Sequence, residues 1–197
     1  MIEALPPLQP YSAAGAYLAR LSELLAGVPE EAVDEVVEVL LRARTRGSRV
    51  YIMGNGGSAA TSAHLATDLM KTSQVAGLRP LRAFSLAESS SLITAWANDT
   101  AYEDVFSQYL SSVLDPDDVV IAISASGNSP NIVRGLEAAR EYGAETIGLV
   151  GFDGGAAADL VDVTIHIRSF DYGLVEDAHM AVGHAVSLAM RCALENN

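Results

Sequence analysis

The chain has 197 residues, of which half are apolar and 19% are charged, a composition typical of one globular domain with a sizeable core. Its formal net charge is −13, with Lys71 as the single lysine, and so acidic a surface repels phosphate backbones and argues against nucleic acid as a direct partner. Cys192 is the only cysteine, which excludes an internal disulfide and a thiolate metal cluster.

The N-terminal region has no basic residue before Arg20, which argues against a secretory signal. No apolar run reaches the ~20 residues that a membrane-spanning helix needs. These two features predict a cytoplasmic protein without a membrane partner.

Two helices are expected at the start of the chain. Residues 11–27 place apolar side chains on one helical face, and a second helix is expected from Pro29 to near Gly47, with Glu30 and Glu31 in its first turn. We interpret residues 1–46 as an N-terminal helical arm of a single domain that covers 1–197. Because such helices need a surface to pack on, we expect a homo-oligomer.

After this arm the pattern alternates between short aliphatic runs and helical stretches. Strands are expected at 49–53, 81–86, 119–124, 146–150 and 163–167. Helices are expected at 58–71, 89–97 continuing to 102–113, 130–142, 155–161 and 175–194. This alternation predicts an α/β fold, with a five-stranded parallel sheet and helices on both of its faces.

Two expected strands end in loops of glycine and serine that open helices. The first loop is Gly54-Asn55-Gly56-Gly57-Ser58, and the second is Ser124-Ala125-Ser126-Gly127-Asn128-Ser129. Such loops direct backbone N–H groups and hydroxyls at the positive end of a helix, where an anion is favoured. Ligands of parallel sheets bind beyond the carboxyl ends of strands. Two such loops in one domain predict a pocket for a phosphorylated small molecule.

Two other interpretations of these loops are possible, and each leaves part of the sequence unexplained. Gly54, Gly56 and Ala59 also fit a dinucleotide fingerprint, but the next strand offers Arg82 and no acid for a ribose hydroxyl. An NADP site using Arg82 leaves the second loop unexplained. Ser129, followed by Pro130, could merely cap a helix, which does not explain the two other serines of that turn.

The histidines and acids offer candidate metal ligands. His64 and Asp68 are four residues apart and therefore share a helical face. Glu176 and His184 lie eight apart, or about 12 Å along a regular helix, so a shared ion needs converging side chains or ligands from different subunits. Glu176 and His179 also have a recognised ligand spacing, so His179 is a rival ligand.

Together these residues resemble a sugar isomerase (SIS) domain. The resemblance rests on the first loop, His64, the run Ala97-Asn98-Asp99 and the second loop, and within the group it is strongest to the phosphoheptose isomerases. Those enzymes interconvert sedoheptulose 7-phosphate and a heptose 7-phosphate. The resemblance implies a SIS-type, flavodoxin-like three-layer fold, a phosphorylated sugar as substrate, and a homotetramer with active sites between subunits.

The resemblance also implies roles for individual positions. The hydroxyls of Ser58, Ser124, Ser126 and Ser129 would hold the phosphate, with Ala125 in the same loop. The sugar would be lined by Asn55, Gly56, Gly57, Asn98, Asp99 and Glu176. Zinc would be bound by His64, Asp68, Glu176 and His184, and Asp68 and His184 would be the catalytic base and acid.

Three positions depart from the family pattern. Asp68 stands where the family has glutamate, which shortens the side chain by roughly 1.5 Å. Glu176 stands where the family has glutamine, and Ala125 where threonine is frequent. The changes at Asp68 and Glu176 motivate an alternative, a non-catalytic phosphosugar-binding regulator. A third hypothesis keeps the isomerase class but changes the substrate to another phosphorylated ketose or aminosugar.

Overall fold

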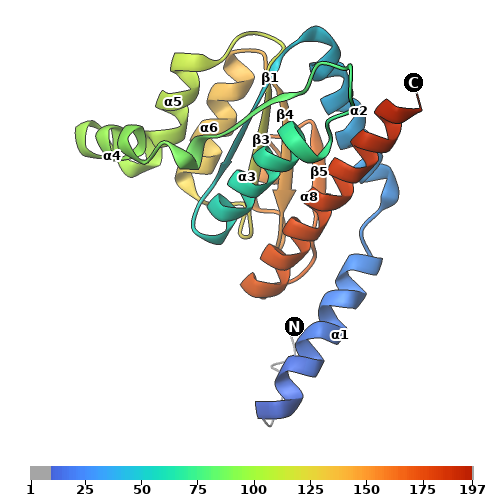
Figure 1. Cartoon of the computed structure of the whole chain (residues 1–197). Coiled ribbons are helices and arrows are strands. Elements are labelled where there is room, and N and C mark those ends of the chain that lie inside the picture. Colours follow the sequence, from blue (N-terminus) through green and yellow to red (C-terminus); the bar gives the residue numbers. More distant parts are fainter. Residues whose placement is uncertain (1–9, 197) are drawn as a thin grey trace.

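The computed structural model describes residues 10–196, and Figure 1 shows its arrangement. The elements occur in the order α1 (Pro10–Ala26), α2 (Glu30–Arg46), β1 (Arg49–Gly54), α3 (Gly57–Thr67), the π-helical turn η1 (Asp68–Thr72), β2 (Arg82–Ser85), the 3₁₀ turn η2 (Leu86–Glu88), α4 (Ser90–Asp99), the 3₁₀ turn η3 (Tyr102–Asp104), α5 (Val105–Val113), β3 (Val119–Ser124), α6 (Pro130–Glu141), β4 (Glu145–Val150), α7 (Gly155–Ala158), β5 (Val163–His166) and α8 (Tyr172–Glu195). The predicted α/β fold with five strands is confirmed.

The five strands form one parallel sheet in the order β2-β1-β3-β4-β5. The chain leaves β1 toward β2 on one side and later returns to β3 on the other side. The strand order therefore reverses between β1 and β3, where Met53 pairs with Ala122 and Gly54 with Ile123. Crevices at such reversal points are where doubly wound folds bind their ligands.

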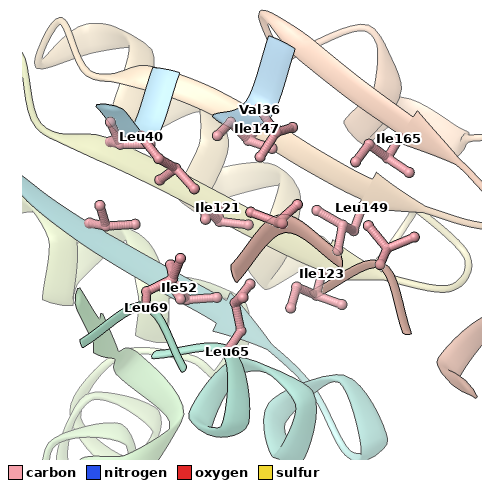
Figure 2. Packing of buried hydrophobic residues seen from close by; sticks show 14 of the residues in the cluster. Val36, Leu40, Ile52, Leu65, Leu69, Ile121, Ile123, Ile147, Leu149 and Ile165 are labelled. Carbon is pink, nitrogen blue, oxygen red and sulfur yellow. The ribbon is translucent and has the colours of Figure 1, made fainter. Parts of the chain in front are cut away.

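Alternate side chains of each strand enter two separate cores, because successive residues of a strand point to opposite faces. Ile52 and Ile121 belong to the core under α2, α3 and α8, whereas Met53 and Ala122 belong to the core under α5, α6 and α7. Figure 2 shows the first core, with Leu40 of α2 above the strands. Burial of both faces explains the continuous apolar runs in the sequence.

Helix α2 packs on the sheet, whereas α1 extends away from it and lies beside the N-terminal part of α8 (Figure 1). Tyr17 of α1 donates a hydrogen bond to Asp177 Oδ2 of α8 at 2.5 Å. That bond raises the pKa of Tyr17 to about 12. Among the described residues of this arm, only α1 thus extends away from the sheet; residues 1–9 lie outside the described part of the chain, and the oligomerisation role assigned to residues 1–46 stays a prediction.

Three helices differ from their expected form. The stretch expected as one helix over 58–71 changes at Asp68 into a π-helical turn, because the Ser73 N–H bonds the Asp68 carbonyl five residues back. The last helix begins at Tyr172 rather than 175, since Asp171 accepts a capping bond from the Leu174 N–H. Helix α7 is shorter than expected.

Among residues 10–196, none of the helices is long and apolar enough to cross a bilayer.

Candidate functional site

The two loops lie side by side at the β1/β3 reversal point and enclose one small pocket. Its volume is about 110 Å³, and no lysine, arginine or histidine of the described chain lines it. The predicted residues among its lining are Asn55, Ser58, Ser124, Ala125, Ser126, Ser129 and Glu176, joined by Tyr172 and Ile123. An anion here would be held by hydroxyls, amides and helix ends.

The first loop brings the chain into α3 through two glycines. Gly56 is the N-cap residue with φ 53° and ψ −122°, a conformation that favours glycine, and Gly57 is the first helical residue. A Cβ at Gly57 would collide with the carboxyl group of Glu176. Glu176 of α8 therefore lies directly against the N-terminus of α3.

The second loop is organised by its own serine hydroxyls. Ser124 Oγ accepts a hydrogen bond from the Gly127 N–H at 3.1 Å, and Ser126 Oγ accepts one from the Asn128 N–H at 3.2 Å. Each hydroxyl still has its proton, since accepting a bond uses only a lone pair. Both serines line the pocket, so both protons are available to a ligand oxygen.

Ser129 is the N-cap residue of α6 and Pro130 is its first residue, as the sequence predicts. However, the Ser129 side chain makes no capping hydrogen bond. The interpretation that Ser129 serves only as a helix cap is therefore wrong, because its side chain does not cap α6. Ser129 lines the pocket instead.

His64, Asp68 and His184 form a second cluster, on α3, the π-helical turn and α8. The two histidine Nε2 atoms are 2.9 Å apart, and Asp68 Oδ2 lies 3.4 Å from His64 Nε2 and 3.5 Å from His184 Nε2. Both imidazoles are about half exposed, whereas the Asp68 side chain is nearly buried. Three donor atoms thus converge on one point that solvent can reach.

This donor set fits a zinc ion. Nitrogen and carboxylate oxygen bind zinc at ~2.0–2.2 Å in tetrahedral sites, so that ligand atoms lie about 3.4 Å from one another. The donor atoms of His64, Asp68 and His184 all lie within 4.8 Å of one another, with the nearest pairs close to that spacing. Three protein ligands leave a coordination position for a substrate, as in catalytic zinc sites.

The π-helical turn orients the carboxylate of this cluster. Thr72 donates a hydrogen bond from its hydroxyl to Asp68 Oδ1 at 2.8 Å. With Oδ1 occupied, Oδ2 is directed at the histidines. Sequence reasoning missed Thr72, since a regular helix was expected through this segment; the four-residue spacing from Asp68 to Thr72 was the available signal.

Two of the predicted or rival ligands lie outside this cluster. The Glu176 carboxylate is not part of the convergent group in this chain and lines the serine pocket. His179 is completely buried, and its ring nitrogens lack a hydrogen bond of normal geometry within the described residues. Burial lowers the pKa of His179 to about 4, so that its ring is neutral at pH 7. The zinc role of Glu176 stays a prediction.

Asn98 and Asp99 lie in the last turn of α4, where Asn98 Nδ2 donates to Asp99 Oδ1 at 2.8 Å. Both side chains are exposed, and neither residue lines the serine pocket of its own chain. Their predicted contact with the sugar stays a prediction.

A second pocket of about 460 Å³ adjoins the first and shares Asn55 and Ser129 with it. Tyr102 of η3 and Asn131 of α6 line this second pocket, and both hydrogen-bond the Asn55 side chain. Sequence reasoning missed them because their contacts with Asn55 span 47 and 76 residues.

The sequence profile of the SIS domain matches residues 16–151. This chain belongs to the SIS domain family. Among curated SIS proteins, the phosphoheptose isomerase of Trichlorobacter lovleyi is 42% identical over 153 residues, which cover 77% of this chain and 77% of the relative. The phosphoheptose isomerase of Pelobacter propionicus is 37% identical over 166 residues, covering 84% of this chain and 87% of the relative.

Solved SIS structures agree with the fold. The phosphoheptose isomerase of Neisseria gonorrhoeae matches with a TM-score of 0.84 at 27% identity, covering 91% of this chain and 96% of that one. A phosphoheptose isomerase from Francisella tularensis matches with a TM-score of 0.85 at 21% identity, covering 93% of this chain and 98% of that one, which supports the fold alone. The expected SIS-type sheet is confirmed.

Proposed function

We propose that this chain is an aldose–ketose isomerase of phosphorylated sugars that converts sedoheptulose 7-phosphate to a heptose 7-phosphate. One observation carries the proposal: α3 and α8 together hold a hydroxyl-lined anion pocket at one end and the His64, Asp68 and His184 cluster farther along. The similarity to enzymes named phosphoheptose isomerase supports the same activity and does not favour a non-catalytic regulator.

The phosphate would occupy the serine pocket. Ser124 and Ser126 would donate their remaining protons to it, and Ser58 and Ser129 would add two more hydroxyls. Gly56, which has open space where a Cβ would lie, would let the phosphosugar approach the backbone at the N-terminus of α3, where the helix dipole favours an anion, and Gly57 would contact the sugar once the Glu176 carboxylate beside it moves away. This local binding suits a protein whose overall charge repels its substrate.

The distance between the two parts of the site suits a seven-carbon sugar. Glu176 borders the serine pocket, and His184 lies eight residues later on the same helix, about 12 Å along its axis. Five C–C bonds of ~1.5 Å separate the ketone carbon from the phosphorylated carbon, a contour of roughly 8 Å before the phosphate group is added. A ligand with its phosphate among the serines would present its ketone end toward the histidines.

At that end, Asp68 and His184 would share the proton transfers. Isomerisation removes a proton from the carbon next to the ketone and returns a proton to the former carbonyl carbon. Asp68 would accept the first proton through Oδ2, since Thr72 occupies Oδ1. His184 would return a proton from Nε2 when that atom is not bound to zinc, and because Nε2 lies 3.5 Å from Asp68 Oδ2 the two groups would act on the same side of the reacting carbons.

Zinc is the proposed cofactor, and His64, Asp68 and His184 would hold it. Glu176 would be a further ligand, supplied either by a second subunit or by rotation of its side chain toward the cluster. When bound, zinc supplies electrostatic stabilisation of negative charge on the substrate oxygens. Asn98 and Asp99 remain proposed sugar contacts that would need an assembled oligomer.

We propose a homo-oligomer, with a tetramer as the expected state, and a cytoplasmic location. An apolar groove of about 420 Å³ between α1, α2 and α8 supports self-association. Its lining includes Leu25, Val33, Ala181 and Ala185, and Leu188 of α8 is 61% exposed. Covering such a surface with a second copy would remove apolar area from water.

The direct test is incubation of the purified protein with sedoheptulose 7-phosphate and zinc, with the aldose product followed by proton NMR. In deuterated water, an isomerase that uses a proton acceptor exchanging with solvent incorporates deuterium next to the carbonyl. We expect turnover by the wild type, and a loss of at least a hundredfold in His184→Ala.

His166→Asn is the matched control, since His166 bonds the Phe152 carbonyl and lies outside the cluster. It should retain activity. No turnover by zinc-loaded wild type, or equal activity of His184→Ala and wild type, would overturn the proposal.

A further inference from the structure

The side chain of Asn55 makes three hydrogen bonds with residues of two other elements, Asn131 of α6 and Tyr102 of η3. Asn55 Nδ2 donates to Asn131 Oδ1 at 2.8 Å, and Asn131 Nδ2 donates back to Asn55 Oδ1 at 2.9 Å. Tyr102 donates its hydroxyl to the same Asn55 Oδ1, also at 2.9 Å. Asn131 is 2% exposed, so this reciprocal amide pair is largely shielded from water.

This arrangement leaves Asn55 with one free hydrogen-bonding function. An amide oxygen has two lone pairs, and an amide nitrogen carries two N–H donors. In Asn55 both lone pairs are used, by Asn131 and Tyr102, and one N–H is used by Asn131. Only the second N–H remains, so Asn55 can act toward a ligand as a donor but not as an acceptor.

The partners of Asn55 are themselves fixed in place. Arg134 of α6 forms ion pairs with Glu103, at 2.7 Å, and with Asp104. Both acids follow Tyr102 directly in the η3 turn. Arg134 lies three residues after Asn131 and therefore near the same face of α6. Helix α6 thus holds both the amide of Asn55 and the turn that carries Tyr102.

Asn55 lines both the serine pocket and the adjoining pocket of about 460 Å³. We propose that Asn131 and Tyr102 are positioning residues. They hold the Asn55 amide so that its remaining N–H donates a hydrogen bond to a sugar oxygen of the bound phosphosugar. The inference rests on the proposed function for the identity of the ligand. Because the ketone end of the proposed ligand points to the histidines, the oxygen that Asn55 meets is a hydroxyl oxygen near the phosphorylated end, which accepts the bond through a lone pair.

The test compares two ligands, sedoheptulose 7-phosphate and inorganic phosphate, by titration calorimetry on the full chain. Tyr102→Phe removes one bond to Asn55 Oδ1, and Asn131→Asp removes the other while keeping the size of the side chain. We expect each variant to bind the sugar phosphate about three- to tenfold more weakly, the effect of losing one well-placed hydrogen bond. Binding of inorganic phosphate to Tyr102→Phe should stay within about twofold, since the serine hydroxyls and the net charge are unchanged. Asn131→Asp adds a negative charge near the pocket and should weaken phosphate binding less than sugar-phosphate binding.

Tyr142→Phe is the matched control, because Tyr142 is exposed and lies outside both pockets. Tyr102 is 57% exposed, so Tyr102→Phe should melt within a few degrees of the wild type even if the buried Asn131→Asp does not. In turnover, both variants should raise KM about three- to tenfold and leave kcat within about twofold, since the lost interaction is made to the bound substrate.

Unchanged sugar-phosphate affinity in Tyr102→Phe and Asn131→Asp, or equal weakening of both ligands, overturns the positioning role. This outcome is distinct from failure of the proposed function, in which the wild type binds the ketose phosphate without converting it. In that case the loss of sugar-phosphate affinity, compared with the loss of inorganic-phosphate affinity in the same variant, still decides whether Asn131 and Tyr102 position Asn55. If the wild type binds no sugar phosphate, both proposals fall.

Discussion

Replacing Thr72 by valine should weaken zinc binding at the His64, Asp68 and His184 cluster. The Thr72 hydroxyl is 2.8 Å from Asp68 Oδ1, and the Asp68 side chain is only 13% exposed, so water cannot readily replace the lost donor. Without that bond the carboxylate can rotate, and Oδ2 is no longer held toward the two imidazoles.

The magnitude follows from the charge on Asp68. A hydrogen bond to a charged group contributes about 1.5–3 kcal/mol. Each ~1.4 kcal/mol corresponds to tenfold in a binding constant, so Thr72→Val should weaken zinc affinity about tenfold to a hundredfold. Loss of a group that orients a metal ligand commonly has an effect of this size.

Zinc affinity is measured by competition with a chromophoric chelator, independently of any activity. Thr72→Ser keeps the hydroxyl and should restore most of the affinity. Thr67→Val is the control, since the Thr67 hydroxyl is exposed and donates to the Ala63 carbonyl rather than to one of the three ligands. If Thr72→Val and Thr67→Val bind zinc equally well, Asp68 is not oriented by the π-helical turn and the reasoning is wrong.

Three further outcomes are expected. Ser124→Ala should weaken binding of inorganic phosphate about tenfold by calorimetry, whereas Ser112→Ala on α5 should not; equal affinities would remove the serine pocket as the phosphate site. Because burial lowers the pKa of His179 from 6.5 to about 4, its contribution to stability is complete above pH 6.5 and is lost as the pH falls toward 4. Urea unfolding should show a decrease of roughly 3 kcal/mol across that range, and His179→Leu should abolish this part of the pH dependence; an unchanged dependence contradicts the assignment. Finally, Ala185→Glu should lower the mass measured by light scattering, since it adds a carboxylate to a groove that already holds Glu30 and Asp34; an unchanged mass would mean that this groove is not the contact between copies.

The sequence alone determined the fold class and the position of the two loops that line the serine pocket. Alternating aliphatic runs and amphipathic helices require a parallel sheet covered on both faces, and the glycine and serine loops follow directly on β1 and β3. These signals are local, because periodicity, capping residues and turn residues act over a few positions. The pairing of His64 with Asp68 is local in the same sense, since a four-residue spacing on a helix is enough to bring the two side chains together.

The tertiary structure decided which distant side chains meet. His184 joins His64 across 120 residues, while Glu176, on the same helix, lies against Gly57 instead. The π-helical turn at Asp68 and the Asn55–Asn131 pair could not be found from local patterns. The amide pair depends on a contact across 76 residues that exists only once α6 is packed beside the first loop, where burial favours polar groups that are hydrogen-bonded to each other.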